Sequence, residues 1–250
     1  MSSAALEIRG LHKRFGGIEA TANVSLSIAK GSLHALIGPN GAGKTTLVAQ
    51  LSGELTPNSG EILHRGTDVT ALDMFRRCRR GIARSFQITS LFDDYTALEN
   101  VLLAVLSRHG RGPRFWNDVM GDHDSIREAE LVLAQVGLAD RRDVLASGLA
   151  HGQQRQLEVG LALATGADVL LLDEPLAGMG AAEATAMIGL LRRLKGTVTL
   201  VLIEHDMEAV FALADRISVL VYGKLIATGT PEEIRLNPEV RAAYLGEGSV

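Results

Sequence analysis

Several features that would place a chain in a familiar class are scarce or missing here. The sequence contains one cysteine, Cys78, so an internal disulfide is excluded, and no metal-ligating residues accompany it as they would in a metal site. We therefore expect the protein to work in a reducing compartment, with Cys78 as an inert side chain.

Long apolar segments and an excess of basic residues are missing as well. The most apolar stretch, 157–172, is interrupted by Glu158 and Asp168, and the first residues have neither a basic start nor a long apolar run. We expect no signal peptide and no segment that spans a membrane. The formal net charge of −4 argues against a general nucleic-acid binder, so no nucleic-acid partner is expected.

One segment that is present carries the most chemical information. It fits the Gly-x-x-x-x-Gly-Lys-Ser/Thr pattern of a loop that wraps nucleotide phosphates, and it consists of Gly38, Pro39, Asn40, Gly41, Ala42, Gly43, Lys44, Thr45 and Thr46. Glycines let backbone N–H groups close around a polyphosphate, and Lys44 would reach the β- and γ-phosphates of ATP. The Thr45 hydroxyl would join the shell of a Mg²⁺ ion, and Thr46 would contact the α-phosphate. An apolar strand predicted at 33–37 and a helix predicted at 44–51 favour this interpretation over a chance glycine-rich turn.

A second segment, 167–174, is an apolar run that ends in two adjacent carboxylates. This pattern is typical of a buried parallel strand that ends at the ligand-facing edge of a sheet. Because side chains alternate along a strand, we predict that Asp173 orients the Mg²⁺ shell while Glu174 faces the attacking water as general base. The pair alone would also fit a solvated turn, and the phosphate loop upstream decides between the two interpretations.

A third segment, 149–158, precedes the acidic strand and contains Ala150, His151, Gly152 and Gln153. It resembles the Leu-Ser-Gly-Gly-Gln signature of ATP-binding cassette (ABC) proteins, and five motifs in the right order agree with that family. By this resemblance Gln87 is a sensor of Mg²⁺ and the γ-phosphate, and His205 contacts the γ-phosphate and supports the transition state. Phe15 matches the aromatic side chain on which the family stacks adenine, although a core phenylalanine is an equal alternative at this position alone.

The same resemblance implies that two cassettes form a two-fold pair, in which each signature caps the γ-phosphate held by the partner's loop. A helix predicted to begin at the signature offers free N–H groups and a positive dipole end to that anion. Ala150 and His151 replace the family's serine and first glycine, and Gly180 lies where an aspartate commonly links the two sites. Every predicted catalytic group is retained, so we expect a cassette that hydrolyses ATP.

The predicted fold class is α/β, a P-loop ABC cassette with a mostly parallel core sheet, flanking helices, an N-terminal antiparallel β region and an inserted helical subdomain. The 250 residues, 46% of them hydrophobic, hold no second copy of the motifs, so a single ABC ATPase domain over 1–250 is expected. We assign 1–87 and 165–250 to the lobe that holds the sheets, and 88–164 to the inserted helical lobe.

Three local patterns give further expectations. The segment 108–116 contains glycine and proline, and it is predicted to be a loop with exposed aromatic side chains. Thr230, Pro231 and Glu233 predict a capped helix start. A group of basic side chains is expected to form a solvated face or a contact between lobes; it comprises Arg76, Arg77, Arg79, Arg80 and Arg84.

Within the family, the chain resembles the ATPase subunits of branched-chain amino-acid importers and their urea and amide relatives. The segments that carry this resemblance are 84–87, 91–92, 97–101, the signature, 202–207 and 229–247. It implies a second ATPase subunit, either a copy of this chain or a paralogue, and separate integral-membrane permease subunits fed by a solute-binding protein. It also implies a peripheral location on the cytoplasmic face of the inner membrane, and the transported solute would never touch this chain.

Two other interpretations stay open at this point. A soluble ABC ATPase that acts on ribosomes or DNA would tend to carry two cassettes or a long coiled-coil insertion, and the sequence shows neither. A nucleotide-gated switch with negligible turnover would tend to lack the general base, whereas Glu174 is present.

Overall fold

A computed structural model describes residues 4–85, 91–110 and 122–245 of the chain. A six-stranded sheet lies at its centre, with the strand order β10-β9-β3-β8-β7-β6. All neighbouring strands in this sheet are parallel except β10, which pairs antiparallel with β9. The strands are β3 (Leu33–Ile37), β6 (Ile82–Ser85), β7 (Val169–Asp173), β8 (Thr199–Ile203), β9 (Arg216–Val221) and β10 (Lys224–Gly229).

A second, four-stranded antiparallel sheet is built mainly from the beginning of the chain. Its order is β2-β1-β4-β5, and its strands are β1 (Ala4–Phe15), β2 (Ile18–Ala29), β4 (Ser59–His64) and β5 (Thr67–Asp68). Helix α1 (Lys44–Ser52) packs between this sheet and the central one, because its side chains Leu47, Val48 and Leu51 share one apolar core with strands of both. The start of α1 is thereby fixed at the edge of the central sheet.

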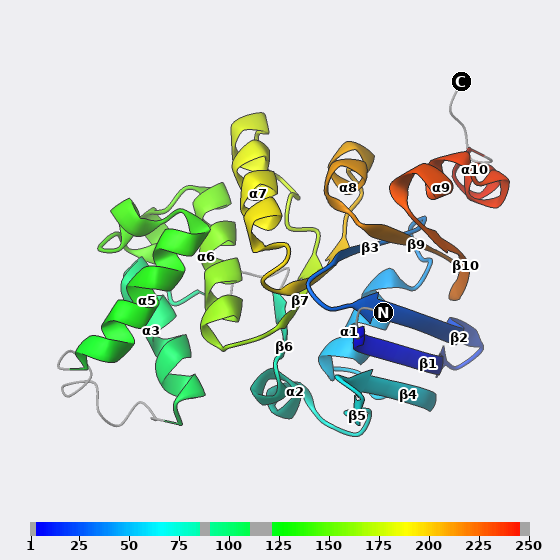
Figure 1. Ribbon diagram of the computed structural model, residues 1–250, viewed down its shortest axis with the longest axis horizontal. Coiled ribbons are helices and arrows are strands. Elements are labelled where there is room, and N and C mark those ends of the chain that lie inside the picture. Colours follow the sequence, from blue (N-terminus) through cyan, green and yellow to red (C-terminus); the bar gives the residue numbers. More distant parts are fainter. Residues whose placement is uncertain (1–3, 86–90, 111–121, 246–250) are drawn as a thin grey trace.

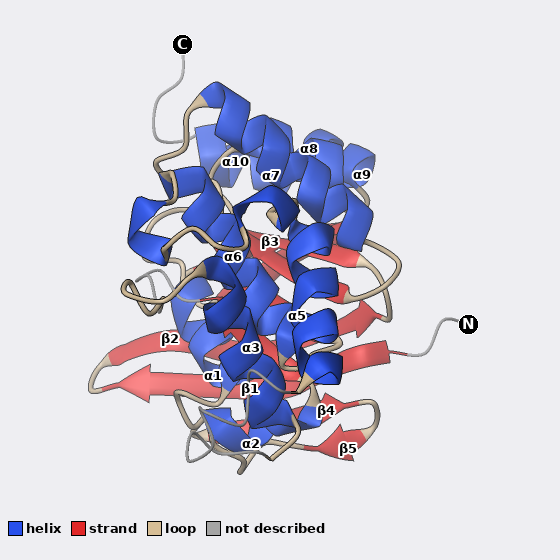
Figure 2. Ribbon diagram, turned by 90° about the vertical axis from the view of Figure 1, so that its left-hand side faces the viewer, coloured by secondary structure: helices blue, strands red, loops and turns tan. Residues whose placement is uncertain are grey.

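Helices cover the other face of the central sheet. Their inward side chains join a second apolar core with β3, β7 and β8, whose residues are all buried as expected for central parallel strands. Figure 2 shows these helices along one side of the sheet. They are α7 (Ala181–Leu194), α8 (Met207–Leu213), α9 (Pro231–Leu236) and α10 (Pro238–Leu245).

A group of helices projects beyond β6, at the left of Figure 1. It contains α3 (Ala97–Arg108), α5 (His123–Val136) and α6 (His151–Ala164), with the short 3₁₀ turns η2 (Ala139–Arg141) and η3 (Ala146–Gly148). Apolar side chains from all three α-helices meet in one cluster. Helix α2 (Met74–Arg80) connects the antiparallel sheet to β6.

The predicted fold class is confirmed by this arrangement. The phosphate-loop strand and helix, the acidic strand and the helix that begins at the signature all lie where the sequence places them. The predicted helix start at Thr230 is also confirmed: Thr230 accepts from Glu233 N, and the Glu233 side chain accepts in return from Thr230 N. None of the helices in the described ranges combines the length and the apolar composition that a membrane span requires.

The interpretation of the basic cluster as a solvated face is wrong for two of its members. Arg76, Arg79 and Arg80 are exposed, but Arg77 is fully buried and the Arg84 side chain is 7% exposed. Arg77 donates hydrogen bonds to the carbonyl oxygens of Gln50, Leu51, Thr70 and Leu72. The predicted loop at 108–116 lies mostly outside the described residues.

Candidate nucleotide site

The glycine-rich loop connects the end of β3 to the start of α1 and is closely packed from outside. A Cβ atom at Gly43, where φ is 100°, would lie 2.1 Å from the carbonyl oxygen of Ala20. At Gly38 it would lie 2.1 Å from the carbonyl oxygen of Leu220. Both positions therefore require glycine, and the loop is held between β2 and β9 in a fixed curve.

The ammonium group of Lys44 contacts the backbone of the glycine-rich loop. The side chain is buried, and Nζ donates to the carbonyl oxygens of Gly38 at 2.7 Å and Pro39 at 3.1 Å. Burial lowers the pKa of Lys44, while the negative charges of Glu174 and Asp173 act in the opposite direction. The loop, the lysine and both predicted carboxylates thus belong to one electrostatic site.

The two carboxylates that end β7 have different surroundings, as the alternation of side chains requires. Asp173 is buried, whereas the Glu174 side chain is 30% exposed and its Oε1 lies 2.8 Å from Nε2 of His205. Glu174 has a φ of 50°, a left-handed conformation that is uncommon for a residue other than glycine, and its N–H donates to the carbonyl oxygen of Ile203. The backbone at the ends of β7 and β8 therefore brings Glu174 and His205 together.

Asp173 uses one of its carboxylate oxygens within the protein. Its Oδ2 accepts from the Arg84 guanidinium at 2.7 Å, whereas Oδ1 is buried and has no hydrogen-bond partner among the described residues. A buried, unpartnered carboxylate oxygen fits the hard oxygen ligands that Mg²⁺ prefers. Gln87, the other residue that we predict near the metal besides Thr45, lies outside the described residues.

Sequence reasoning missed Glu204, which stands next to His205 at the end of β8. Glu204 is buried, and its carboxylate accepts from the backbone N–H groups of Leu176 at 2.7 Å and His205 at 3.1 Å. Burial raises the pKa of Glu204 in spite of these hydrogen bonds. Glu204 therefore fixes both the segment that follows Glu174 and the backbone of His205, which contacts Glu174. The sequence signal that could have identified Glu204 is an acidic residue directly after an apolar run.

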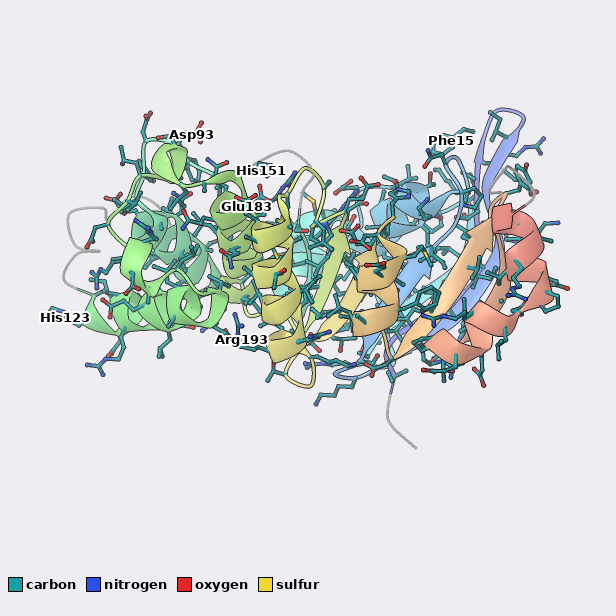
Figure 3. The ribbon with its side chains drawn as sticks, turned by 90° about the horizontal axis from the view of Figure 1, so that it is seen from above. Phe15, Asp93, His123, His151, Glu183 and Arg193 are labelled. Carbon is teal, nitrogen blue, oxygen red and sulfur yellow. The ribbon has the colours of Figure 1, made fainter. Side chains whose placement is uncertain are left out.

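The signature residues form the first turn of α6, with Ala150 as N-cap. Glu183, which sequence reasoning also missed, reaches this turn from α7: its Oε1 accepts from Gly152 N at 3.0 Å and its Oε2 from Gly180 N at 3.2 Å. These two hydrogen bonds lower the pKa of Glu183. His151 is exposed beside Gly178, and Figure 3 shows it close to Glu183.

Phe15 lies at the tip of the β1–β2 hairpin. Its ring is 49% exposed, which favours a stacking surface over a core position, and Nζ of Lys13 lies 5.4 Å from its centroid. Figure 3 shows Phe15 and His151 along the same side of the molecule and far apart.

Known proteins are similar to this chain in sequence and in fold. Residues 21–177 match the family described as "ABC transporter". The chain belongs to the ABC transporter family. Residues 224–250 also match the family described as "Branched-chain amino acid ATP-binding cassette transporter".

Individual relatives agree with this assignment along the whole cassette. The chain is 39% identical to the "High-affinity branched-chain amino acid transport ATP-binding protein LivG" of Salmonella typhimurium, over 99% of this chain and 100% of that protein. Among solved structures, a nucleotide-free ATP-binding cassette from an ABC transporter matches with a TM-score of 0.85 and 30% identity, covering 98% of this chain and 100% of the other. The ADP conformation of another such cassette matches with a TM-score of 0.84 and 28% identity, covering 98% and 99%.

Membership of the family fixes the general activity. The cassette binds nucleotide, hydrolyses ATP and serves as the motor subunit of a transport system, which implies partners that form the path through the membrane. The predicted resemblance to ABC proteins is confirmed, and nothing in these similarities favours a ribosomal or DNA-acting ATPase.

Proposed function

We propose that this cassette powers the uptake of branched-chain amino acids or of related amides or urea. The LivG relative, similar over its whole length, is named for branched-chain amino-acid transport, and the end of the chain matches a family of the same name. The hydrolytic part of the proposal rests above all on one observation, the 2.8 Å contact between Glu174 and His205 at the end of the sheet that carries the glycine loop.

Hydrolysis would proceed by attack of a water molecule on the γ-phosphorus of ATP, with cleavage of the bond to the oxygen that bridges the β- and γ-phosphates. Glu174 would accept the proton of that water, and the His205 ring would hold Glu174 and contact the γ-phosphate. Lys44, whose Nζ holds loop carbonyls in this structure, would move its hydrogen bonds to the β- and γ-phosphates. The products would be ADP and inorganic phosphate.

The residues present fit a Mg²⁺ ion that binds together with the nucleotide. No group of three His, Cys, Asp or Glu side chains in the described ranges could hold a metal by itself. Thr45, Gln87 and Asp173 would contribute oxygens to the metal shell, and phosphate and water oxygens would complete it. When bound, the ion would neutralise charge on the β- and γ-phosphates.

Closure over the nucleotide would require a second cassette, either a copy of this chain or a paralogue. The separation of Phe15 from the signature within one chain supports this part of the proposal. The first turn of α6, with Ala150, His151, Gly152 and Gln153, would present backbone N–H groups to the γ-phosphate bound by the partner. The Gly152 N–H, which donates to Glu183 Oε1 in this structure, would exchange that carboxylate for the phosphate.

An apolar hollow of about 300 Å³ would receive the permease at the cytoplasmic face of the inner membrane. It lies between α2, β6 and the helical group, and its lining includes Met74, Phe75, Leu91, Ala104 and Leu161. Phe75 is 63% exposed, so its ring is available to a partner beside the other apolar side chains of the hollow. We propose that 1–87 with 165–250 form one lobe and 88–164 the other, so that this hollow marks their junction.

The proposal is tested by measuring ATP turnover of the chain purified with its membrane subunits, with and without a solute-binding protein and candidate solutes. Stimulation by leucine, isoleucine or valine, or by an amide or urea, identifies the cargo class. Turnover that is the same without membrane subunits and with every solute contradicts the transport role and favours a cassette that acts away from the membrane.

A further inference from the structure

Arg84 lies between two carboxylates, Asp173 and Glu54, at the candidate nucleotide site. It lies on β6, and its side chain is 7% exposed. One guanidinium nitrogen donates to Asp173 Oδ2 at 2.7 Å, and another donates to Glu54 Oε2 at 2.7 Å. The Asp173 side chain is fully buried and that of Glu54 is 31% exposed.

This arrangement fixes the direction of both ionic groups. A guanidinium is planar and presents its donors in a rigid fork, so an arginine held at two points has little freedom to rotate. Glu54 lies just beyond the end of α1, and Asp173 lies at the end of β7. Arg84 therefore ties the helix of the phosphate loop to the acidic strand, and removal of its charge would leave a buried carboxylate without a cation.

The division of the Asp173 oxygens suggests what this link accomplishes. Oδ2 is taken by Arg84, and Oδ1, which is buried, has no partner in the part of the chain that the structure describes. A carboxylate held through one oxygen offers the other in a defined orientation, as hydrogen-bonded carboxylates around metal ions do. The ion pair with Arg84 thus leaves one oxygen for the metal shell and prevents the carboxylate from turning away.

We propose that Arg84 is a positioning residue for the metal that binds with ATP, and that Glu54 in turn positions Arg84. The inference rests on the proposed role of Asp173 in the Mg²⁺ shell. It assigns to Arg84 a role that its place in the basic cluster of the sequence did not indicate. Arg84 acts through Asp173 and does not touch the nucleotide.

The test compares the full chain with Arg84→Met, Arg84→Lys and Glu54→Gln, and Arg76→Met serves as the matched control. The Arg76 side chain is 68% exposed and belongs to the same group of arginines. Mn²⁺ replaces Mg²⁺ as a probe, and its binding in the presence of a non-hydrolysable ATP analogue is followed by electron paramagnetic resonance. Binding of the same analogue without metal is measured by calorimetry.

We expect Arg84→Met to weaken Mn²⁺ binding about 10- to 100-fold, the usual effect of losing a residue that orients a metal ligand. Arg84→Lys and Glu54→Gln should show smaller losses in the same direction, and Arg76→Met none. Metal-free binding of the analogue should change less than about twofold in every variant, because the phosphate loop is intact. A purely structural role would weaken both kinds of binding together.

Two results would overturn the inference while leaving the proposed function standing. One is unchanged Mn²⁺ binding in both Arg84→Met and Glu54→Gln; the other is an equal loss of metal-dependent and metal-free binding. If Arg84→Met does not fold, Arg84→Lys decides, because it keeps a positive charge beside the buried Asp173 but loses the rigid fork that contacts Asp173 and Glu54 together. A parent chain that binds no Mn²⁺ with the analogue would overturn the proposed function as well.

Discussion

Acid should destabilise this cassette through a buried histidine that has no part in the proposed chemistry. His34, on β3, is 1% exposed, and its Nε2 lies 2.8 Å from Oγ of Ser218 on β9. Ser218 Oγ lies in turn 2.7 Å from the Thr228 hydroxyl on β10. Burial, and then the charge of Arg216, lowers the pKa of His34 from 6.5 to about 4.

The sign and size of the effect follow from this shift. The unfolded chain takes up a proton on this imidazole as the pH falls through 6.5, whereas the folded chain takes it up only near 4. Protons therefore favour the unfolded state, and stability is lost as the pH falls between these values. The loss due to His34 is about 2 kcal/mol at pH 5 and approaches about 3 kcal/mol at pH 4, at about 1.4 kcal/mol per pKa unit.

The assay is urea unfolding of the parent and of His34→Gln at pH 7 and pH 5. Glutamine can keep the hydrogen bond to Ser218 and does not titrate, so the stability difference between the two proteins should shift by about 2 kcal/mol in favour of the variant at pH 5. His123→Gln, at an exposed position on α5, is the control and should keep the pH response of the parent. Equal pH responses of the parent and His34→Gln would refute the reasoning.

Three other substitutions test the phosphate loop, the adenine surface and the core. Lys44→Ala should weaken ATP binding itself, because its ammonium is the charge of the loop; unchanged affinity by calorimetry would count against a phosphate loop. Phe15→Ala should weaken ATP binding about 5- to 150-fold while Phe15→Trp retains it, since stacking on a base is worth about 1–3 kcal/mol; equal affinities of the parent and Phe15→Ala would remove Phe15 from the site. Arg77→Met should lower the free energy of unfolding by about 3–4 kcal/mol, because four carbonyl oxygens lose their donor. A loss no larger than that caused by Arg76→Met, at an exposed position, would show that these hydrogen bonds do not stabilise the fold.

The sequence predicted the site best where the backbone conformation and the chemistry require the same residues at the same positions. A loop that must approach phosphate needs glycine at fixed positions, and the close contacts of Gly38 and Gly43 show that need in the fold. The acidic strand could be assigned only together with the phosphate loop upstream, because two adjacent carboxylates alone would also fit a solvated turn. The sequence and the family resemblance predicted that Glu174 and His205 both act near the γ-phosphate. The 2.8 Å contact between them depends on the register of β7 with β8.

Other residues could not be placed from the sequence because their roles depend on distant partners. Arg77 and Arg84 belong to one basic group along the chain, yet Arg77 donates to carbonyl oxygens in the last turn of α1, and Arg84 pairs with Asp173, 89 residues away. Glu183 is an ordinary helical acid until α6 and α7 are packed side by side, which brings its carboxylate to Gly152 N. Such long-range partners are set by tertiary packing, which periodicity and composition do not reveal.

The central claim is that this chain hydrolyses ATP with Glu174 as the base that activates water. The most direct test compares phosphate release and the oligomeric state of the parent and of Glu174→Gln, each with ATP and Mg²⁺. We expect the variant to lose hydrolysis but still to bind ATP and to accumulate as a nucleotide-bound pair of cassettes. Undiminished phosphate release by Glu174→Gln would show that Glu174 is not the base.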